Sequence, residues 1–512
     1  MALATMFWVG VQGQADPLAG AVRRLMQESG LPAIDRGFRP QDVPGDPGRR
    51  LAAPVPIDRA SAASLVYLPD SVIVKFKDGA DRSAAVNSTL AQVSGGSADR
   101  PSSADFDVIT IGAGVDPEAA AAALAARSDV EYAQPRYLNH KMYKPNDPLY
   151  SNQWNFPAID MERAWDIQQS SGPEVIVAVL DTGVAFRTAT IRYNSRFAFR
   201  LTPGGPVYPA LGVVDVPFAA APELGSGSRF VSPRDFIWDD NDPVDLDGHG
   251  THVSGTIGQL TNNSVGVAGM AFNVRIMPVK VISETWDLIF GAPNGGTDDV
   301  VARGVRYAAD NGAKVINMSL GRESGGPAPA VDDAIRYAVG KGVFVAIASG
   351  NTRETGNQPN VIGNIAPSLA GAVTVGAVGR SLETAFYSTT SPAVELSAPG
   401  GDTRQAGGGS GGILQQTLDL DLLETYNRPV SQYGPPRADS FAYYYFQGTS
   451  MAAPHVSGFA ALLIQQGITS PAGVEEAMKT YATDKGTAGR DDLYGVGLIN
   501  PRATLRGLGL AR

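Results

Sequence analysis

A serine stands at the start of a long apolar segment, in the stretch GTSMAAPHVSG from Gly448 to Gly458. The apolar residues continue to Gln465 and predict a buried helix that begins at Ser450. The Ser450 hydroxyl would lie among the unpaired N–H groups of the first turn, where negative charge that develops on an attacked carbonyl oxygen is stabilised. A serine alone is a weak nucleophile, so this interpretation requires a histidine base and a carboxylate. The alternative is an ordinary helix cap.

Candidates for both partners occur upstream. The run VIVAVL from Val175 to Leu180 predicts a buried strand, and Asp181 follows at its carboxyl end, where open α/β sheets place their chemistry. His249 lies in GHGTHVSG, before a stretch of helical character. The chain order Asp181, His249, Ser450 is the order of subtilisin and differs from the orders of chymotrypsin and the α/β-hydrolases.

These blocks resemble the motifs of the subtilisin-like serine proteases, and within them the thermitase-like branch. DTG, HGTHVSG and GTSMAAPHVSG all match, and a fourth block, ASGN from Ala348 to Asn351, is similar to the one that holds the oxyanion asparagine of that family. The resemblance covers about residues 66 to 505. It implies the α/β class: a subtilisin-like three-layer fold with a mainly parallel sheet, preceded by a small α+β propeptide domain.

The resemblance also implies catalytic roles. Ser450 would attack the scissile carbonyl, His249 would take the proton, and Asp181 would fix the imidazole tautomer. Asn351 would donate its side-chain amide to the oxyanion, together with the backbone N–H of Ser450. A turn asparagine after a buried strand is the alternative for Asn351.

Short segments are similar to the substrate-binding edges of the family, along which an extended peptide adds as a β-strand. Arg322 and Asp298 depart from the family pattern, because a glycine and an aromatic residue are frequent at these positions. The substrate-binding residues that the resemblance implies are Ser319, Leu320, Gly321, Gly295, Gly296, Ala348, Ser349 and Gly350.

The loop LTNNSVGV, which begins at Leu260, is similar to the calcium loop of the family, which supplies one asparagine side chain and several backbone carbonyls to a hard cation. The implied ligands are Asp147, Leu260, Asn263, Val265 and Val267. The carboxylate that the turn after DTG usually contributes is missing, and a site with one anionic oxygen fewer binds calcium more weakly. An asparagine-rich turn is the alternative.

Aspartates crowd the segment before His249, at positions 235, 239, 240, 242, 245 and 247. Such charges repel one another unless a metal ion or water neutralises them. The cluster resembles the second calcium site of thermitase-like enzymes, with Asp235, Asp240 and Asp242 as ligands. A solvated acidic loop is the alternative.

Composition limits the functional class. With 512 residues, of which 43% are hydrophobic, the chain can bury a large core. A net charge of −10 without basic runs argues against nucleic acid and anionic membrane surfaces, so peptides are the expected partners. The absence of cysteine excludes disulfides, and a zinc site of His249, His252 and His455 has no HExxH pattern to support it. No apolar run reaches the length of about 18 residues that a membrane span needs.

The chain divides into four predicted regions. Apolar residues 2–11, followed by small residues, predict a signal peptide over 1–15, although the usual cationic start is missing. Residues 16–65 are rich in Pro, Arg, Asp and Gly and predict a disordered linker. Strand and helix patterns in 66–142 resemble the inhibitory propeptide of the family, and 143–508 is expected to form the peptidase domain.

Together, residues and resemblance predict a secreted serine endopeptidase, extracellular or periplasmic before export, that hydrolyses peptide bonds through an acyl-enzyme. It would be a self-processing zymogen, with its propeptide as inhibitor and folding aid, a monomer when mature, with structural Ca²⁺ and no organic cofactor. One rival is a processing protease in which the long stretches 185–234 and 402–446 restrict entry to the cleft. The other rival is a catalytically inactive protein that binds peptides without cleaving them, and the intact triad argues against it.

Overall fold

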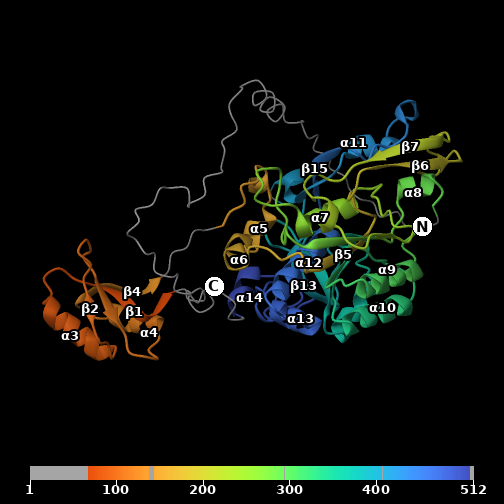
Figure 1. Ribbon diagram of the computed structural model, residues 1–512. Coiled ribbons are helices and arrows are strands. Elements are labelled where there is room, and N and C mark those ends of the chain that lie inside the picture. The colour runs from red at the N-terminus through yellow and green to blue at the C-terminus, as the bar shows by residue number, and fades with distance from the viewer. Residues whose placement is uncertain (1–66, 138–142, 293–294, 406, 508–512) are drawn as a thin grey trace, which may run out of the picture. The chain divides into compact units, whose positions relative to one another are not determined.

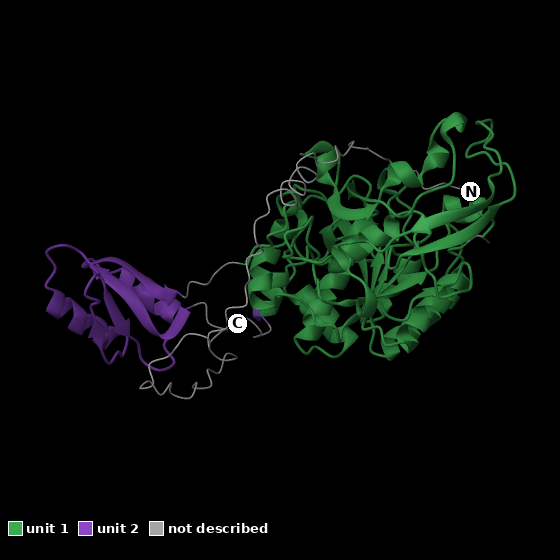
Figure 2. Cartoon of the chain, turned by 45° about the horizontal axis from the view of Figure 1, so that its top comes forward, with its two compact units in different colours: residues 1–45, 143–505 green, residues 46–142, 506–512 purple. Residues whose placement is uncertain are grey.

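The computed structural model describes residues 67–137, 143–292, 295–405 and 407–507. These residues form two compact units, of which the smaller contains residues 67–137 and the larger contains residues 143–505 as far as they are described (Figure 2). Each unit has its own apolar core. The segments predicted as signal peptide and linker lie outside the described residues.

The smaller unit is an antiparallel sheet with two helices, and its strand order is β2-β3-β1-β4. Alternate residues of β1, Val72 and Val74, share the core with Leu124 of α4. Both helices begin after an aspartate, Asp81 or Asp116, whose side chain accepts first-turn N–H bonds. The elements are β1 (Tyr67–Phe76), α3 (Arg82–Gln92), β2 (Ala98–Asp99), β3 (Asp107–Thr110), α4 (Pro117–Ala125) and β4 (Val130–Tyr137).

The larger unit is built around a sheet of seven strands, in which all neighbours pair in parallel in the order β13-β12-β11-β10-β5-β9-β8 (Figure 1). Nearly all residues of these strands are buried because both faces of the sheet are covered, and most of the buried residues are apolar. β5 lies between β10 and β9, so Asp181 at its end emerges near the middle of the sheet. The strands are β5 (Ile176–Asp181), β8 (Arg234–Asp235), β9 (Arg275–Lys280), β10 (Val315–Met318), β11 (Phe344–Ala348), β12 (Ala372–Val378) and β13 (Val394–Pro399).

Helices pack on both faces of this sheet. α9 and α10 share one core with β5, β9, β10 and β11. α7 and α12 pack on the other face, where the Ser457 hydroxyl of α12 donates to Asn317 Oδ1 of β10 at 2.9 Å. This three-layer arrangement confirms the predicted fold class. The helices are α5 (Asn155–Ala158), α6 (Met161–Ile167), α7 (His249–Gly258), α8 (Thr285–Ile289), α9 (Asp298–Asp310), α10 (Pro329–Gly340), α11 (Leu420–Leu423), α12 (Thr449–Gln465), α13 (Pro471–Thr480) and α14 (Pro501–Leu505).

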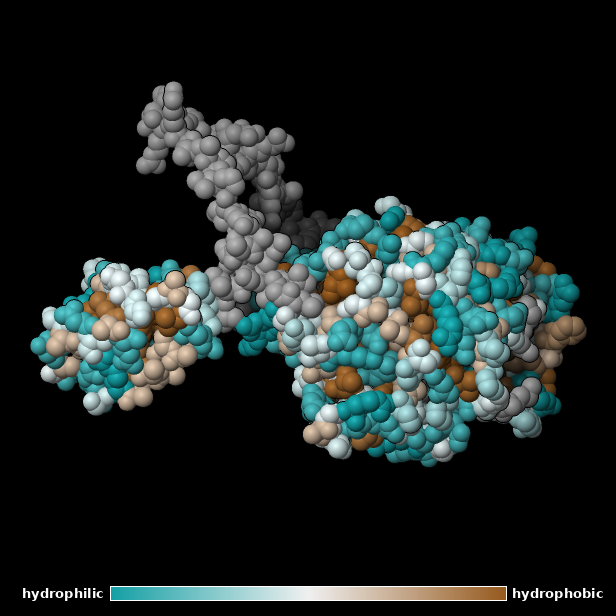
Figure 3. Space-filling view, turned by 90° about the horizontal axis from the view of Figure 1, so that it is seen from below, coloured by the Kyte–Doolittle hydropathy of each residue, from teal (hydrophilic) through white to brown (hydrophobic). Residues whose placement is uncertain are grey.

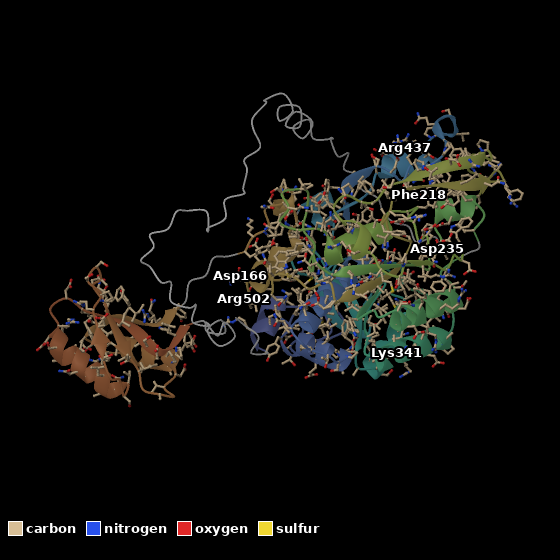
Figure 4. The ribbon with its side chains drawn as sticks, in the orientation of Figure 1. Asp166, Phe218, Asp235, Lys341, Arg437 and Arg502 are labelled. Atoms are coloured by element: carbon tan, nitrogen blue, oxygen red, sulfur yellow. The ribbon has the colours of Figure 1, made fainter. Side chains whose placement is uncertain are left out.

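Two antiparallel hairpins occupy the stretches that exceed the core. In the first, β6 (Ala189–Ser195) pairs with β7 (Gly212–Phe218); in the second, β14 (Ile413–Leu418) pairs with β15 (Phe441–Phe446). The two insertions meet where the Ala438 N–H donates to the Pro217 carbonyl at 3.0 Å, and Phe218 and Arg437 mark this region in Figure 4. Both insertions are therefore folded parts of the larger unit.

The surface of the larger unit is mixed in polarity. On the face shown in Figure 3, apolar residues are scattered between polar ones. None of the helices in the described part of the chain combines the length and the apolar character that a membrane span requires.

Candidate active site

Asp181 and His249 are in direct contact at the carboxyl end of the central sheet. Asp181 is the last residue of β5, and His249 is the first residue of α7. Asp181 Oδ1 and His249 Nδ1 are 2.7 Å apart, and both side chains are buried. Because the carboxylate holds Nδ1, the other imidazole nitrogen, Nε2, is left to accept a proton.

A buried carboxylate, Asp245, shapes the turn that precedes His249. It accepts hydrogen bonds from the backbone N–H groups of Asp247, Gly248 and Thr251 at 2.9–3.0 Å. The Thr182 hydroxyl donates to the same carboxylate at 3.0 Å. The turn that delivers the histidine is thus tied to the residue that follows Asp181. The sequence showed Asp245 only as one member of an acidic cluster.

Ser450 is the second residue of α12. Its hydroxyl donates to the Ser319 carbonyl at 3.2 Å, and the Ser319 hydroxyl donates back to the Ser450 carbonyl at 2.7 Å. A cavity of about 170 Å³ is lined by Ser450, His249 and Asn351, among others. Three of the four residues predicted to act in catalysis therefore open into one cavity. For proton transfer to His249, the Ser450 hydroxyl must rotate away from Ser319.

The orientation of the Asn351 side chain is fixed by the residue next to Ser450. Asn351 Oδ1 accepts from the Thr449 backbone N–H at 2.9 Å and from the Thr449 hydroxyl at 3.1 Å. The same hydroxyl accepts from the Gly350 N–H at 3.2 Å. Since the amide oxygen is engaged, the NH₂ group remains as a hydrogen-bond donor at the cavity.

The two segments Ser319–Gly321 and Ala348–Gly350 lie side by side and are joined by Asn360, which the sequence did not single out. Asn360 Nδ2 donates to the Ala348 carbonyl at 2.7 Å and to the Leu320 carbonyl at 3.0 Å. Its Oδ1 accepts from the Arg322 N–H at 3.2 Å. No motif around Asn360 could have revealed this role, because its partners come from two other strand ends.

The second predicted edge, Gly295-Gly296, follows β9 and α8 in the chain. The Gly296 N–H donates to the Val281 carbonyl at 2.7 Å, and its φ of +81° lies in the left-handed region. Close by in the chain, the Asp298 carboxylate binds the Arg322 guanidinium with two contacts of 3.2 and 3.1 Å. An ion pair therefore joins the start of α9 to the residue that follows Gly321.

The surroundings of His249 favour its protonated form. Burial alone would lower the pKa of His249, but the charge and hydrogen bond of Asp181, with the charges of Asp247 and Asp245, raise that pKa to about 9. The other two histidines of the larger unit stay neutral, since burial lowers the pKa of His252 to about 3 and that of His455 to about 4.

Those two histidines also have structural hydrogen bonds. His252 Nε2 lies 3.0 Å from the Ile413 carbonyl, and His455 Nδ1 lies 2.8 Å from the Met451 carbonyl. His455 Nε2 lies 2.8 Å from Asn155 Nδ2. These contacts are those of packing residues in the core of the larger unit.

The loop that resembles a calcium site holds Asp147 at its centre. The Asp147 carboxylate accepts from the backbone N–H groups of Asn262 at 2.7 Å and Asn263 at 3.2 Å, and burial raises its pKa. Asn263 Oδ1 accepts from the Val265 N–H at 2.9 Å. The loop thus brings Asp147 together with the predicted segment from Leu260 to Val267.

Glu223, from the end of the first insertion, is a second buried carboxylate at this loop. It accepts from the Val267 N–H at 3.2 Å, from Gln259 Nε2 at 3.0 Å and from Gln416 Nε2 at 2.9 Å, and the Tyr443 hydroxyl also donates to it. Burial and the charge of Asp147 raise the pKa of Glu223 to about 7. Two buried carboxylates among amide and carbonyl oxygens form a donor set of the kind that Ca²⁺ prefers. The structure thus places a second buried carboxylate, which the sequence did not single out, beside the loop that resembles a calcium site.

The acidic cluster before His249 is divided between several kinds of partner. Asp242 forms a 2.8 Å ion pair with Arg187, and Asp240 Oδ1 accepts from the Asp242 N–H at 2.8 Å. Asp235, labelled in Figure 4, is fully buried in β8, and its Oδ2 has no hydrogen-bond partner among the described residues. Burial raises the pKa of Asp235 to about 7, partly offset by the nearby Lys280 charge. Most members of the cluster thus have protein partners, and Asp235 keeps one free oxygen.

Comparison with known proteins gives two family matches. The model of the subtilase family matches residues 172–497, and that of the fervidolysin N-terminal prodomain matches residues 53–136.

Individual proteins are similar over most of the chain. The thermophilic serine proteinase of Bacillus sp. (strain AK1) is 32% identical, over 78% of this chain and 79% of its own length. Thermitase of Thermoactinomyces vulgaris is 30% identical, over 70% and 98%. The extracellular protease of Xanthomonas campestris pv. campestris is 30% identical, over 70% and 56%. The crystal structure of fervidolysin from Fervidobacterium pennivorans shares the fold, with a TM-score of 0.51 at 23% identity over 86% and 61% of the two chains.

Proposed function

This chain belongs to the subtilase family of serine proteases, and we propose that it is a secreted endopeptidase made as a self-processing zymogen. The observation that carries the proposal is the 2.7 Å contact between Asp181 and His249, at a cavity that Ser450 and Asn351 also line. Ser450 Oγ forms the bond to the scissile carbonyl carbon while His249 Nε2 takes its proton. Asp181 stabilises the resulting imidazolium, and Asn351 with the Ser450 N–H stabilises the oxyanion.

The acyl-enzyme then forms when the carbon–nitrogen bond breaks and the proton on His249 moves to the leaving amine. A water molecule then attacks the ester carbonyl while His249 takes a proton from it. The bond to Ser450 Oγ breaks, His249 returns the proton to Ser450, and the carboxylic acid product leaves. Protein substrates would bind as extended strands along Ser319–Gly321 on one side and Gly295-Gly296 on the other, with Ala348–Gly350 beside the oxyanion asparagine.

Calcium is part of the proposal as a structural ion. Asp147, Asn263 and Glu223, with the backbone carbonyls of Leu260, Val265 and Val267, would hold a first Ca²⁺. We do not propose the second Ca²⁺ at Asp235, Asp240 and Asp242, because the described residues contain no group of three acidic or histidine side chains placed to hold a metal ion. Bound Ca²⁺ would neutralise buried carboxylates and hold the loops together, without a part in the chemical step.

The remaining parts of the proposal concern the whole protein. The prodomain match over residues 53–136 supports a propeptide that inhibits the enzyme and assists its folding. A relative named an extracellular protease supports secretion, and we infer that the mature enzyme acts as a monomer.

A fluorophosphonate probe tests the proposed chemistry directly, because it forms a covalent bond only with an activated serine. Peptide mass spectrometry should find the adduct on Ser450, and His249→Ala should prevent labelling in a protein with an unchanged unfolding midpoint. Loss of activity with the adduct on another residue would refute the assignment. Equal labelling of wild type and His249→Ala would refute the shared mechanism.

A further inference from the structure

The cavity that holds Ser450 has an acidic wall beside His249. Asp247 and Glu284 both line this cavity, and Asp247 Oδ1 accepts from the His249 backbone N–H at 3.1 Å. Asp247 lies in the turn before α7, whereas Glu284 lies directly before α8. Two elements thus bring carboxylates to the same side of the reacting groups.

A third carboxylate comes from the second insertion. Glu424 follows α11, and the charge of Asp247 raises its pKa further, after burial, to about 7. Burial and the same Asp247 charge raise the pKa of Glu284. Asp247 therefore lies within electrostatic reach of both Glu284 and Glu424 in a partly buried region. A cation bound beside Asp247, Glu284 and Glu424 would favour the ionised forms of these carboxyl groups.

The lysine and arginine side chains nearest to these carboxylates already have acidic partners of their own. Arg322 is the one lysine or arginine among the described residues that line the cavity, and it is held by Asp298. Lys280, whose charge reaches Glu284, is buried against Asp287 at 2.9 Å. Each of these cations already has a carboxylate of its own, so a cation that enters the cleft would meet two carboxylates with which no lysine or arginine of the described residues is paired.

We propose that this cleft selects substrates that carry a lysine or arginine close to the scissile bond, with the cationic group held between Asp247 and Glu284. The inference rests on the proposed function, since Ser450 and His249 line the same cavity and define its ligand as a peptide. A charge-assisted hydrogen bond to such a cation would form in a partly desolvated site, whereas an acidic side chain would be repelled. The chain is then a protease of restricted specificity, in accord with the insertion that contributes Glu424.

Fluorogenic peptides test the proposed preference for lysine or arginine. The wild-type protein is produced as the full chain and is allowed to mature before the assay. Lysine, norleucine and glutamate are placed in turn at each position from four residues before the scissile bond to two after it. At one position, kcat/KM for lysine should exceed that for the equally long norleucine by about tenfold or more, as expected for a hydrogen bond to a charged group. Glutamate should be the poorest there, and added NaCl should reduce the preference.

Variants then locate the source of the preference. Asp247→Asn keeps an oxygen for the His249 N–H, and Glu284→Gln keeps the side-chain length; together they should bring the ratio of lysine to norleucine within about threefold of unity. The matched control is Asp333→Asn, which removes an equal charge from the exposed surface of α10 and should leave the ratio unchanged.

Two results would overturn the inference. One is a wild type with no position at which lysine is preferred to norleucine by more than about threefold. The other is a preference that survives in the folded double variant. If no peptide is cleaved and the fluorophosphonate probe leaves Ser450 unlabelled, the proposed function itself fails, whereas efficient cleavage without a charge preference rejects only the inference about substrate class.

Discussion

At the scale of single residues, buried carboxylates decide both the position and the protonation of His249. Asp181 binds its Nδ1 directly, and Asp245 binds the turn that carries it. Asp247 accepts its backbone N–H and adds a third negative charge. Each charge that holds the imidazole in place also stabilises the imidazolium form. Precise placement of the base thus comes with a pKa of His249 above its ordinary value.

This pKa predicts an alkaline rise in activity. His249 must be neutral to accept the Ser450 proton, so kcat/KM should be low where the imidazole is charged and should increase as pH passes through the pKa of about 9. Removal of one neighbouring charge in Asp247→Asn should shift this rise to lower pH. The measurement is kcat/KM against pH with a norleucine peptide. A rise complete below pH about 6, or a shift toward higher pH in Asp247→Asn, would contradict the assignment of the base.

Asn351 allows a second prediction at this scale. Its amide oxygen is held by Thr449, so only the NH₂ group can face the developing oxyanion. Asn351→Ala should lower kcat by about 10²–10³-fold with little change in KM, the loss that removal of one such donor causes in subtilisin. Steady-state kinetics would show the split. A large change in KM with kcat preserved would instead assign Asn351 to ground-state binding.

At the scale of elements, the central parallel sheet could be predicted well and the insertions could not. A parallel strand is buried on both faces, so its sequence is a continuous apolar run, and the predicted run Val175–Leu180 corresponds to β5 to within one residue at each end. β10 ends at Met318, and the next residues, Ser319–Gly321, leave the sheet and line the cavity. β6 and β15 are only partly buried and carry no comparable pattern.

Contacts between distant segments explain why part of the site was missed. Glu223 meets Gln259, Gln416 and Tyr443, which are supplied by three different parts of the chain. Asn360 likewise acts only through two strand ends. Ser450, His249 and Asp181 could be recognised because each has a local motif. Glu223 and Asn360 have none, and only the folded chain brings their partners together.

The loop from Leu260 to Val267 allows a prediction about the effect of calcium on thermal stability. A ligand that binds only the folded protein stabilises it by RT ln(1 + [L]/Kd), or about 2.7 kcal/mol at a hundredfold excess over Kd. Chelation should therefore lower the thermal midpoint of the mature enzyme, and both Glu223→Gln and Asn263→Ala should remove much of that difference. Calorimetry with Ca²⁺ and with EGTA measures it. The control Glu354→Gln changes an exposed ion pair with Arg404 and should keep the full difference. A midpoint that is the same with and without chelator would mean that this loop binds no calcium.

At the scale of the whole molecule, the larger unit is anchored from its first described residues onward. The Tyr143 N–H donates to Asp166, and Asn146 Oδ1 accepts from the Ser264 N–H at 2.8 Å. The Leu149 N–H donates to the Gly266 carbonyl at 2.8 Å. A cut that frees the prodomain must therefore fall before Asn146 if the mature enzyme is to keep the hydrogen bonds of Asn146 and Leu149.

The last prediction is that the precursor cuts itself between about Asn139 and Asn146. The sheet of the larger unit pairs strands that are far apart in sequence, such as Val315 with Val177, and a topology of this kind folds slowly unless a prodomain lowers the barrier. Ser450→Ala should thus accumulate as an uncut precursor of 53.5 kDa, or slightly less if a signal peptide is removed, whereas the wild type should lose the prodomain and the segment before it. Intact mass and N-terminal sequencing of both proteins give the result. Asp333→Asn should mature like the wild type, because its exposed α10 carboxylate has no part in the site. If purified Ser450→Ala were trimmed at the same junction with no other protease present, self-processing would be excluded, and the cut would have to come from another enzyme.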